Sequence, residues 1–211
     1  MPVAYRTTVC DVVEKIIEGP ICVGLLIFLA PLMLLVAATI KLQDGGPILF
    51  GHTRIGKGGR TFKCWKFRSM VVDAEVRLKA LLDRDLEARI EWDRDHKLRE
   101  DPRVTAFGDF LRRSSIDELP QLFNVLAGEM SLVGPRPIVA SEQARYRHYF
   151  RLYCQMRPGI TGLWQVSGRS DTSYRRRVAL DVAYARARTL KLYFQILFAT
   201  APAVLARKGA H

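Results

Sequence analysis

An uncharged segment near the N-terminus constrains this 211-residue chain more than any other feature. Residues 19–40 read GPICVGLLIFLAPLMLLVAATI, 22 consecutive residues without a charged side chain. About 20 apolar residues in a helix suffice to cross the hydrocarbon core of a bilayer. A cleaved signal peptide is the alternative, but acidic Asp11, Glu14 and Glu18 precede the segment and no small-residue cleavage pattern follows it. The segment therefore predicts a membrane anchor.

Pro31 lies near the middle of this segment and predicts a bend, because proline removes a backbone donor and its ring clashes with the preceding turn. Two topologies follow: a kinked helix that crosses the membrane, or a sharp bend that returns the chain to the side from which it entered. The flank at residues 41–68 carries seven basic residues and one acid. The positive-inside rule places that flank in the cytoplasm.

The net charge of +12 indicates polyanionic partners: nucleic acid, anionic lipid or phosphorylated substrates. Residues 71–103 hold 10 of the 21 acids but 8 of the 33 basic residues, so the positive charge belongs to the flanks of that stretch. The four cysteines are scattered without CxxC spacing. They do not predict a zinc site, and nothing in the sequence requires disulfides.

Residues 47–70 predict a β-hairpin, two β-rich runs around a Gly-Lys-Gly-Gly turn. Residues 51–57 match most of a phosphate-binding P-loop. Gly58, however, stands where that motif needs a hydroxyl, and no helix former follows. A P-loop is therefore excluded. Residues 72–100 predict a helix with a solvated charged face, because leucine and isoleucine recur there at helical spacing.

Near the C-terminus, a basic stretch at residues 173–191 precedes an apolar stretch at residues 192–206, which is too short to span a bilayer. This order is typical of amphipathic helices that lie on an anionic membrane surface. An ordinary core helix with a solvated basic face explains the pattern equally well.

The adjacent acids Asp117 and Glu118 lie at the start of an apolar helical pattern. Ser115 and Glu118 have the spacing of a capping box, which would explain the acids without chemistry. Pro120 complicates this explanation, because it would delete a hydrogen bond inside a helix capped by Ser115. If Pro120 is instead the first helical residue, the acids lie in the preceding turn. Both registers place them at a helix N-terminus.

Arginines surround this pair in the sequence. Arg112 and Arg113 precede it, while Arg136, Arg157 and Arg169 lie beside proline or glycine in loops. Arginines on rigid loops suit a bidentate grip on phosphate, and we expect them to keep a neighbouring carboxylate ionised. Such a carboxylate can hold magnesium or attack phosphorus. The residues alone thus indicate magnesium-dependent phosphoryl chemistry at a membrane surface, whereas a serine–histidine triad has little support.

The run RRSSIDELPQLFNVLAGEMSLVGPRP, with KFRSM before it and RPGITGLWQVSGR and LDVAY after it, resembles the bacterial sugar transferase family. These are monotopic polyprenyl-phosphate phosphoglycosyl transferases, which begin the assembly of capsule, O-antigen and exopolysaccharide. The resemblance covers almost the whole chain. We expect the small catalytic-domain form, since only a short helix precedes the apolar segment.

The resemblance implies roles for the matching residues. Asp117 would be the nucleophile that attacks the sugar-bearing phosphorus of a nucleotide-diphosphate sugar and forms a covalent aspartyl-phosphosugar. Glu118 would be a ligand of Mg²⁺, and Arg112 would bind a phosphate, that of the lipid. Residues 135–137 would shape the wall of the site, and the role of Asp181 stays open. The other candidate substrate-binding residues are Arg113, Pro135, Arg136, Pro137, Arg157, Gln165, Arg169 and Asp181.

The resemblance also implies the architecture. The fold class is α+β and mostly helical, with a re-entrant N-terminal membrane helix, a short β-hairpin and amphipathic interfacial helices around a compact catalytic core. The re-entrant bend falls on Ala30 and Pro31, although the family commonly has Ser-Pro there. Residues 1–42 form the anchor and residues 43–211 the catalytic domain.

The expected substrates are a UDP-hexose and polyprenyl (undecaprenyl) phosphate, used at the cytoplasmic face of the bacterial inner membrane. Anionic lipid is a further expected partner, and a homodimer is left open. Two alternatives from other classes are a membrane-bound nucleic-acid-binding protein and a non-catalytic scaffold of a polysaccharide assembly complex. The arginines lie among prolines and glycines rather than on a recognition helix, so no nucleic-acid partner is expected. The intact pair Asp117–Glu118 argues against the scaffold.

Overall fold

The computed structural model describes residues 9–95, 98, 100–168 and 173–205. It confirms a mostly helical chain with little β-structure. In chain order the elements are α1 (Val9–Asp44), β1 (Leu49–Ile55), η1 (Lys57–Gly59), β2 (Thr61–Phe67), α2 (Ala74–Arg84), α3 (Leu86–Asp95), α4 (Ala106–Arg113), η2 (Ile116–Glu118), α5 (Gln121–Leu126), β3 (Ser131–Val133), η3 (Ala140–Glu142), α6 (Gln143–Tyr146), η4 (Arg147–Tyr149), α7 (Phe150–Tyr153), β4 (Gly159–Thr161), α8 (Leu163–Val166), α9 (Tyr174–Ala187) and α10 (Leu190–Leu205).

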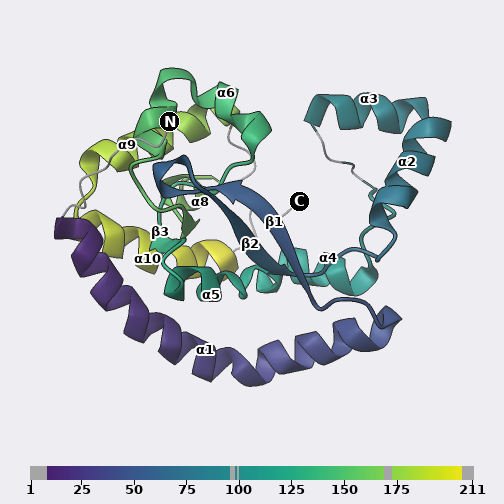
Figure 1. The fold of residues 1–211 in the computed structure, drawn as a ribbon, viewed down its shortest axis with the longest axis horizontal. Helices are drawn as coiled ribbons and strands as arrows, with labels where there is room; N and C mark the ends of the chain where they lie inside the picture. The colour runs from purple at the N-terminus through teal and green to yellow at the C-terminus, as the bar shows by residue number, and fades with distance from the viewer. Residues whose placement is uncertain (1–8, 96–97, 99, 169–172, 206–211) are drawn as a thin grey trace.

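Helix α1 contains the apolar segment and lies as a long arc beneath the rest of the chain (Figure 1). Among the described residues it is the one helix long and apolar enough to cross a membrane, and only 11% of its most apolar window is buried. A core helix of a soluble protein would be mostly buried. The helix continues through Ala30 and Pro31, and Figure 1 shows a gradual curve in place of the predicted sharp bend.

The predicted hairpin is confirmed. Strands β1 and β2 pair antiparallel, with Leu49 opposite Phe67 and Ile55 opposite Thr61. The turn has Gly58 at φ 73°, a left-handed conformation that glycine adopts without strain. The segment that resembles a P-loop is this strand and turn, and its Lys57 pairs with Asp11 of α1 at 3.0 Å. Its exclusion is therefore confirmed.

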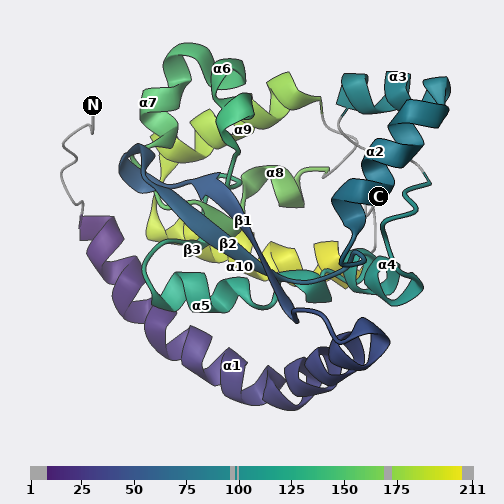
Figure 2. The ribbon, with the colours of Figure 1, turned by 45° about the vertical axis from the view of Figure 1, so that its right-hand side comes forward.

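The predicted helix at residues 72–100 is divided. Helices α2 and α3 are separated by Asp85, whose backbone is extended at φ −124° and ψ 109°. The Asp85 carboxylate accepts a hydrogen bond from the backbone N–H of Ala88 at 3.0 Å, so this residue caps a second helix. Figures 1 and 2 show α2 and α3 projecting together to one side of the molecule.

A second, parallel pair of strands has no clear sequence signal. Strands β3 and β4 pair Ser131 with Gly159 and Val133 with Thr161. They approach closely beyond their ends: a Cβ added to Gly159 would lie 2.1 Å from the backbone nitrogen of Gly134. Glycine is therefore needed at this contact, and the contact brings the loops that contain Arg136 and Arg157 together.

Three apolar clusters hold these elements together. The first joins α1, α5, β3 and α10, the second joins β1, α6, α7 and α9, and the third packs the C-terminal half of α1 on β2 and α4. Helix α10 buries Tyr193 and Ile196 in the first cluster while Phe198 is exposed. The C-terminal apolar stretch thus has a core face, and its contact with a membrane surface remains a prediction.

Candidate active site

The acidic pair lies in a tight turn between two helices. Thr105 caps helix α4, because its hydroxyl oxygen accepts a hydrogen bond from the backbone N–H of Gly108. Beyond the other end of α4, Ser115 adopts a left-handed conformation at φ 58°. The acids follow in η2, and Pro120 precedes α5 at φ −61°. The capping-box prediction is wrong, because the Ser115 side chain makes no capping hydrogen bond. The register with Pro120 at the start of the next helix is confirmed.

A lysine, rather than an arginine, is in contact with both acids. The ammonium nitrogen of Lys66 on β2 lies 2.6 Å from Glu118 Oε1 and 3.3 Å from Asp117 Oδ2. Asp117 is buried, whereas the Glu118 side chain is 36% exposed. Burial opposes the charge on Lys66, but the charges of Glu118 and Asp117 raise the pKa of Lys66 above its ordinary value.

Burial raises the pKa of Asp117 above its ordinary value, and the Lys66 charge lowers it in part. The sequence predicted that neighbouring arginines keep Asp117 ionised, whereas in the structure Lys66 has the larger effect on the Asp117 pKa. Arg112 makes a smaller contribution of the same sign. Its Nε donates a hydrogen bond to the Ser69 hydroxyl at 2.8 Å, and a Cβ at Gly108 would lie 1.9 Å from the Ser69 carbonyl oxygen. Helix α4 thus presents Arg112 beside the KFRSM segment.

Arg113 is not brought to the pair. Its guanidinium pairs with Asp109 one turn earlier, at 2.8 Å, on the exposed side of α4. The structure gives no contact that supports the predicted substrate role of Arg113.

Arg157 was expected to face substrate, and the structure places it elsewhere. Its side chain is buried beside α1, 2.8 Å from Glu18 and 4.0 Å from Glu14, and it donates to the carbonyl oxygen of Met130 at 3.0 Å. Glu18 also accepts hydrogen bonds from the backbone N–H of Leu132 and from the Ser131 and Tyr193 hydroxyls. Arg157 is a residue that fixes α1 to the core.

The Pro135–Arg136–Pro137 turn follows β3 and is held by two backbone contacts. Gly159 N–H donates to the Pro135 carbonyl oxygen at 2.9 Å, and Arg54 donates to the Pro137 carbonyl oxygen at 3.2 Å. The Arg136 guanidinium lies 5.4 Å from the centroid of Trp164 on α8. These contacts fix the turn, and the Arg136 side chain on it is half-buried; its role as a wall of the site stays a prediction.

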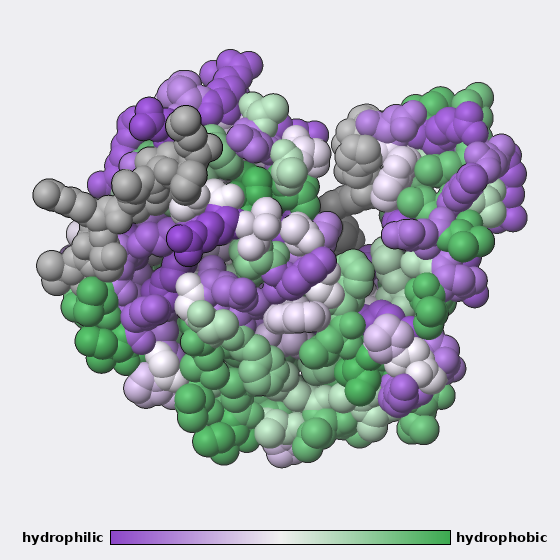
Figure 3. Space-filling view, viewed as in Figure 1, coloured by the Kyte–Doolittle hydropathy of each residue, from purple (hydrophilic) through white to green (hydrophobic). Residues whose placement is uncertain are grey.

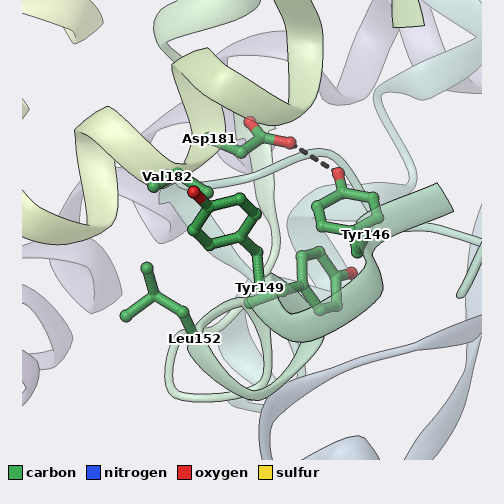
Figure 4. Close-up of a pocket in the computed structure, with 6 residues that line it drawn as sticks. Tyr146, Tyr149, Leu152, Asp181 and Val182 are labelled. Atoms are coloured by element: carbon green, nitrogen blue, oxygen red, sulfur yellow. Dashed lines mark hydrogen bonds between the residues drawn. The ribbon is translucent and has the colours of Figure 1, made fainter. Parts of the chain in front are cut away.

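Asp181 lies on α9, where it is buried against α6 and α7. Its carboxylate accepts a hydrogen bond from the Tyr146 hydroxyl at 2.6 Å, in a packed pocket formed with Tyr149, Leu152 and Val182 (Figure 4). Burial raises the pKa of Asp181 to about 7, while the Tyr146 hydrogen bond and the charges of Arg177 and Arg136 lower it.

Gln165 and Arg169 complete the predicted set. The Gln165 amide lies 3.4 Å from the Ile160 carbonyl oxygen, and its Oε1 is buried without a hydrogen-bond partner among the described residues. Arg169 lies outside the described residues.

Sequence reasoning gave no individual role to four residues near the site: Lys66, Arg54, Glu142 and Arg177. Lys66 and Arg54 lie on the same face of the hairpin, which strand alternation alone predicts once the register is known. Arg177 lies four residues before Asp181 on one face of α9, a spacing visible in the sequence.

The acidic pair offers the small number of carboxylate ligands that a magnesium ion usually takes from a protein. No group of three or more histidine, cysteine or acidic side chains that could hold a metal ion occurs in the part of the chain that the structure describes. Mg²⁺, however, usually takes only one or two carboxylates and completes its shell with water and substrate phosphates. The half-exposed Glu118 carboxylate next to Asp117 matches this donor set, with Lys66 as its present partner.

Comparisons with known proteins agree with one another. The family model described as bacterial sugar transferase matches residues 9–207. An undecaprenyl-phosphate galactose phosphotransferase of Salmonella typhimurium is 52% identical over 89% of this chain. An exopolysaccharide production protein of Sinorhizobium fredii is 48% identical over 88% of it, and a UDP-glucose:undecaprenyl-phosphate glucose-1-phosphate transferase of Xanthomonas campestris 41% over 95%. The chain spans 39% of the Salmonella protein, 40% of the Xanthomonas protein and 82% of the Sinorhizobium protein.

Proposed function

The chain belongs to the bacterial sugar transferase family, and on that premise we propose that it transfers a sugar 1-phosphate from a nucleotide-diphosphate sugar to polyprenyl phosphate. The observation that carries this proposal is the buried Asp117 carboxylate in contact with Lys66, beside Glu118 and Arg112. The names of the Salmonella and Xanthomonas relatives point to a hexose donor and an undecaprenyl phosphate acceptor.

The first step is a displacement at the sugar-bearing phosphorus. An Asp117 carboxylate oxygen forms the new bond to phosphorus, and the bond to the bridging oxygen of the diphosphate breaks. The electron pair leaves with the nucleoside monophosphate. The Lys66 ammonium group keeps Asp117 anionic before attack, against the effect of burial.

The second step returns the enzyme to its starting state. A phosphate oxygen of the polyprenyl phosphate attacks the same phosphorus, and the bond to Asp117 breaks with its electron pair, which restores the carboxylate. Arg112, fixed by Ser69, is placed to bind the incoming phosphate. Two displacements let one small site serve a soluble and a lipid substrate in turn.

Glu118 would hold Mg²⁺ together with the substrate phosphates. When bound, the ion offsets the negative charge of the diphosphate.

We also propose that α1 is re-entrant. Near its N-terminal end, Glu14 and Glu18 are buried against Arg157 and Arg188 of the catalytic domain. At its C-terminal end, Asp44 pairs with Arg68, and Val36 and Ile40 pack on β2 and α4. A folded, charged domain stays on one side of a bilayer, so a helix fixed to it at both ends enters and leaves on that side.

The apolar middle of α1 points away from the domain. Its exposed side chains include Ile27 at 71% and Phe28 at 79%. Figure 3 shows apolar surface along the lower side of the molecule, where Figure 1 places α1, and polar surface above it. This arrangement supports a shallow anchor in the cytoplasmic leaflet of the inner membrane, with the site at the headgroup level.

The test is transfer activity in nanodiscs that contain polyprenyl phosphate and Mg²⁺, with a panel of radiolabelled nucleotide sugars. The proposal expects label in the lipid fraction from at least one donor and none with Asp117→Asn. Asp109→Asn, on the exposed side of α4, is the matched control and should retain activity. Near wild-type transfer by Asp117→Asn would overturn the assignment of the nucleophile.

A further inference from the structure

Three arginines from distant parts of the sequence converge around Trp164 and Glu142. Arg54 comes from β1, Arg136 from the turn after β3 and Arg177 from α9. Arg136 and Arg177 lie over the ring of Trp164, with guanidinium carbons 5.4 and 5.2 Å from its centroid. Burial and the charge of Arg136 lower the pKa of Arg54.

The nearby acids only partly offset this positive charge. Glu142 lies 3.7 Å from Arg54 through one carboxylate oxygen and 3.7 Å from Arg177 through the other. Both distances are longer than a hydrogen bond, so Glu142 forms only a long ion pair with each guanidinium group. Asp181 is the second acid, and burial raises its pKa to about 7, so at neutral pH it is only partly charged.

Arg177 has unused donors at this place. Its side chain is nine-tenths buried, and its Nε and one terminal nitrogen make no hydrogen bond within the part of the chain that the structure describes. Buried guanidinium donors without acceptors are costly, and a bound anion is a common reason why they persist. Besides the long ion pair with Glu142, Arg54 makes a 3.2 Å hydrogen bond to the Pro137 carbonyl oxygen and a 3.2 Å contact with His52 Nδ1.

The position of this cluster relative to Asp117 follows from the hairpin register. Phe50 is opposite Lys66, and Arg54 is four residues further along β1 on the same face. At about 3.4 Å per residue, Arg54 is about 14 Å along the hairpin from the residue pair that holds Lys66. The turn that contains Arg136 lies against β1, because Arg54 donates a hydrogen bond to the Pro137 carbonyl oxygen at 3.2 Å.

We propose that Arg54, Arg136 and Arg177 bind the nucleoside monophosphate half of the donor, and that the Glu142 carboxylate is an internal counter-ion which that phosphate displaces. This inference rests on the proposed function. With the sugar-bearing phosphorus at Asp117, the second phosphate and the nucleoside extend along the hairpin toward the three arginines.

The arrangement also assists the first displacement. When the bond between phosphorus and the bridging oxygen breaks, its electron pair adds negative charge to the leaving monophosphate. Guanidinium groups fixed by Trp164 and the backbone stabilise that charge without reorganising. This phosphate carries one negative charge in the intact donor and becomes a doubly charged terminal phosphate when the bond breaks, a change that the arginines favour.

The experiment measures binding of uridine 5′-monophosphate, and separately of inorganic pyrophosphate, to the full chain in nanodiscs by isothermal titration calorimetry. We expect Arg54→Gln to weaken binding by about tenfold or more, because one charged hydrogen-bonding partner is lost. Glu142→Gln keeps the shape and removes the competing charge, so it should tighten binding several-fold. Arg60→Gln, in the exposed hairpin turn, is the control and should bind as wild type.

Opposite effects of Arg54→Gln and Glu142→Gln support the proposal, with protein folding verified by thermal unfolding. Unchanged affinity in Arg54→Gln would overturn the site, and weaker binding in Glu142→Gln would overturn the displaced counter-ion. Failure of this anion site can be distinguished from failure of the proposed function. If the protein transfers sugar but binding does not depend on Arg54, only the anion site is refuted. If pyrophosphate binding depends on Arg54 but no sugar is transferred, only the transferase proposal is refuted.

Discussion

The most informative perturbation of the fold is Arg157→Met, because the sequence and the structure assign this residue different roles. In the structure its guanidinium is the cation 2.8 Å from Glu18 and 4.0 Å from Glu14, and both carboxylates are 1% exposed. Methionine retains much of the apolar stem but leaves these buried acids with less compensation. Removing one partner of a buried pair costs about 3–5 kcal/mol.

This cost is measurable as a lower midpoint of thermal unfolding. For a chain of this size, each kcal/mol of lost stability lowers the unfolding midpoint by about 2–4 °C, so the expected decrease is about 6–20 °C. The assay is thermal unfolding in nanodiscs, with Arg60→Met as the exposed control. Below the unfolding transition, the folded variant should bind uridine 5′-monophosphate as tightly as wild type. An unchanged midpoint together with lost nucleotide binding would refute the anchoring role and restore the substrate-facing prediction.

Two further predictions concern titrating groups. Lys66→Gln removes the cation that lowers the pKa of Asp117, so that pKa rises and the acid limb of the pH–rate profile for nucleoside monophosphate release moves to higher pH; an unmoved limb would mean that Lys66 does not control Asp117. Asp181 has a pKa of about 7 in the fold against an ordinary 3.8, so the folded state binds more protons between these values and stability falls as pH rises through that window. The difference corresponds to about 4 kcal/mol at most. Asp181→Asn should remove most of this fall in pH-dependent unfolding curves, and a wild-type pH dependence in the variant would contradict the buried-acid account.

Much of the fold was predictable from local patterns. Alternation and the glycine-rich turn at residues 56–59 predict the hairpin, and Pro120 restricts where the helix after the acids can begin. The apolar segment predicts the anchor but not its path, because Pro31 permits both a crossing and a return. Strands β3 and β4 contain three residues each, too few for a recognisable period.

The site was predictable where chemistry is local and was missed where partners are remote. Asp117 and Glu118 are adjacent in the sequence and have arginines nearby, so the sequence alone indicated phosphoryl chemistry for them. Lys66 reaches them from 51 residues away through the hairpin register. Arg157 pairs with Glu14 and Glu18 on the N-terminal helix α1. Nothing in the sequence except the charges of these two acids indicated that pairing. Side-chain direction at such positions depends on tertiary packing, which no single-sequence pattern contains.

The central claim is that the Asp117 carboxylate forms a covalent bond to phosphorus. Intact-protein and peptide mass spectrometry, after rapid mixing with the nucleotide sugar and Mg²⁺ in the absence of polyprenyl phosphate, tests it most directly. The account predicts a phosphosugar adduct at Asp117 that disappears when polyprenyl phosphate is added, and no adduct in Asp117→Asn. Lipid product formed under the same conditions, without an adduct at residue 117 at any time, would contradict it.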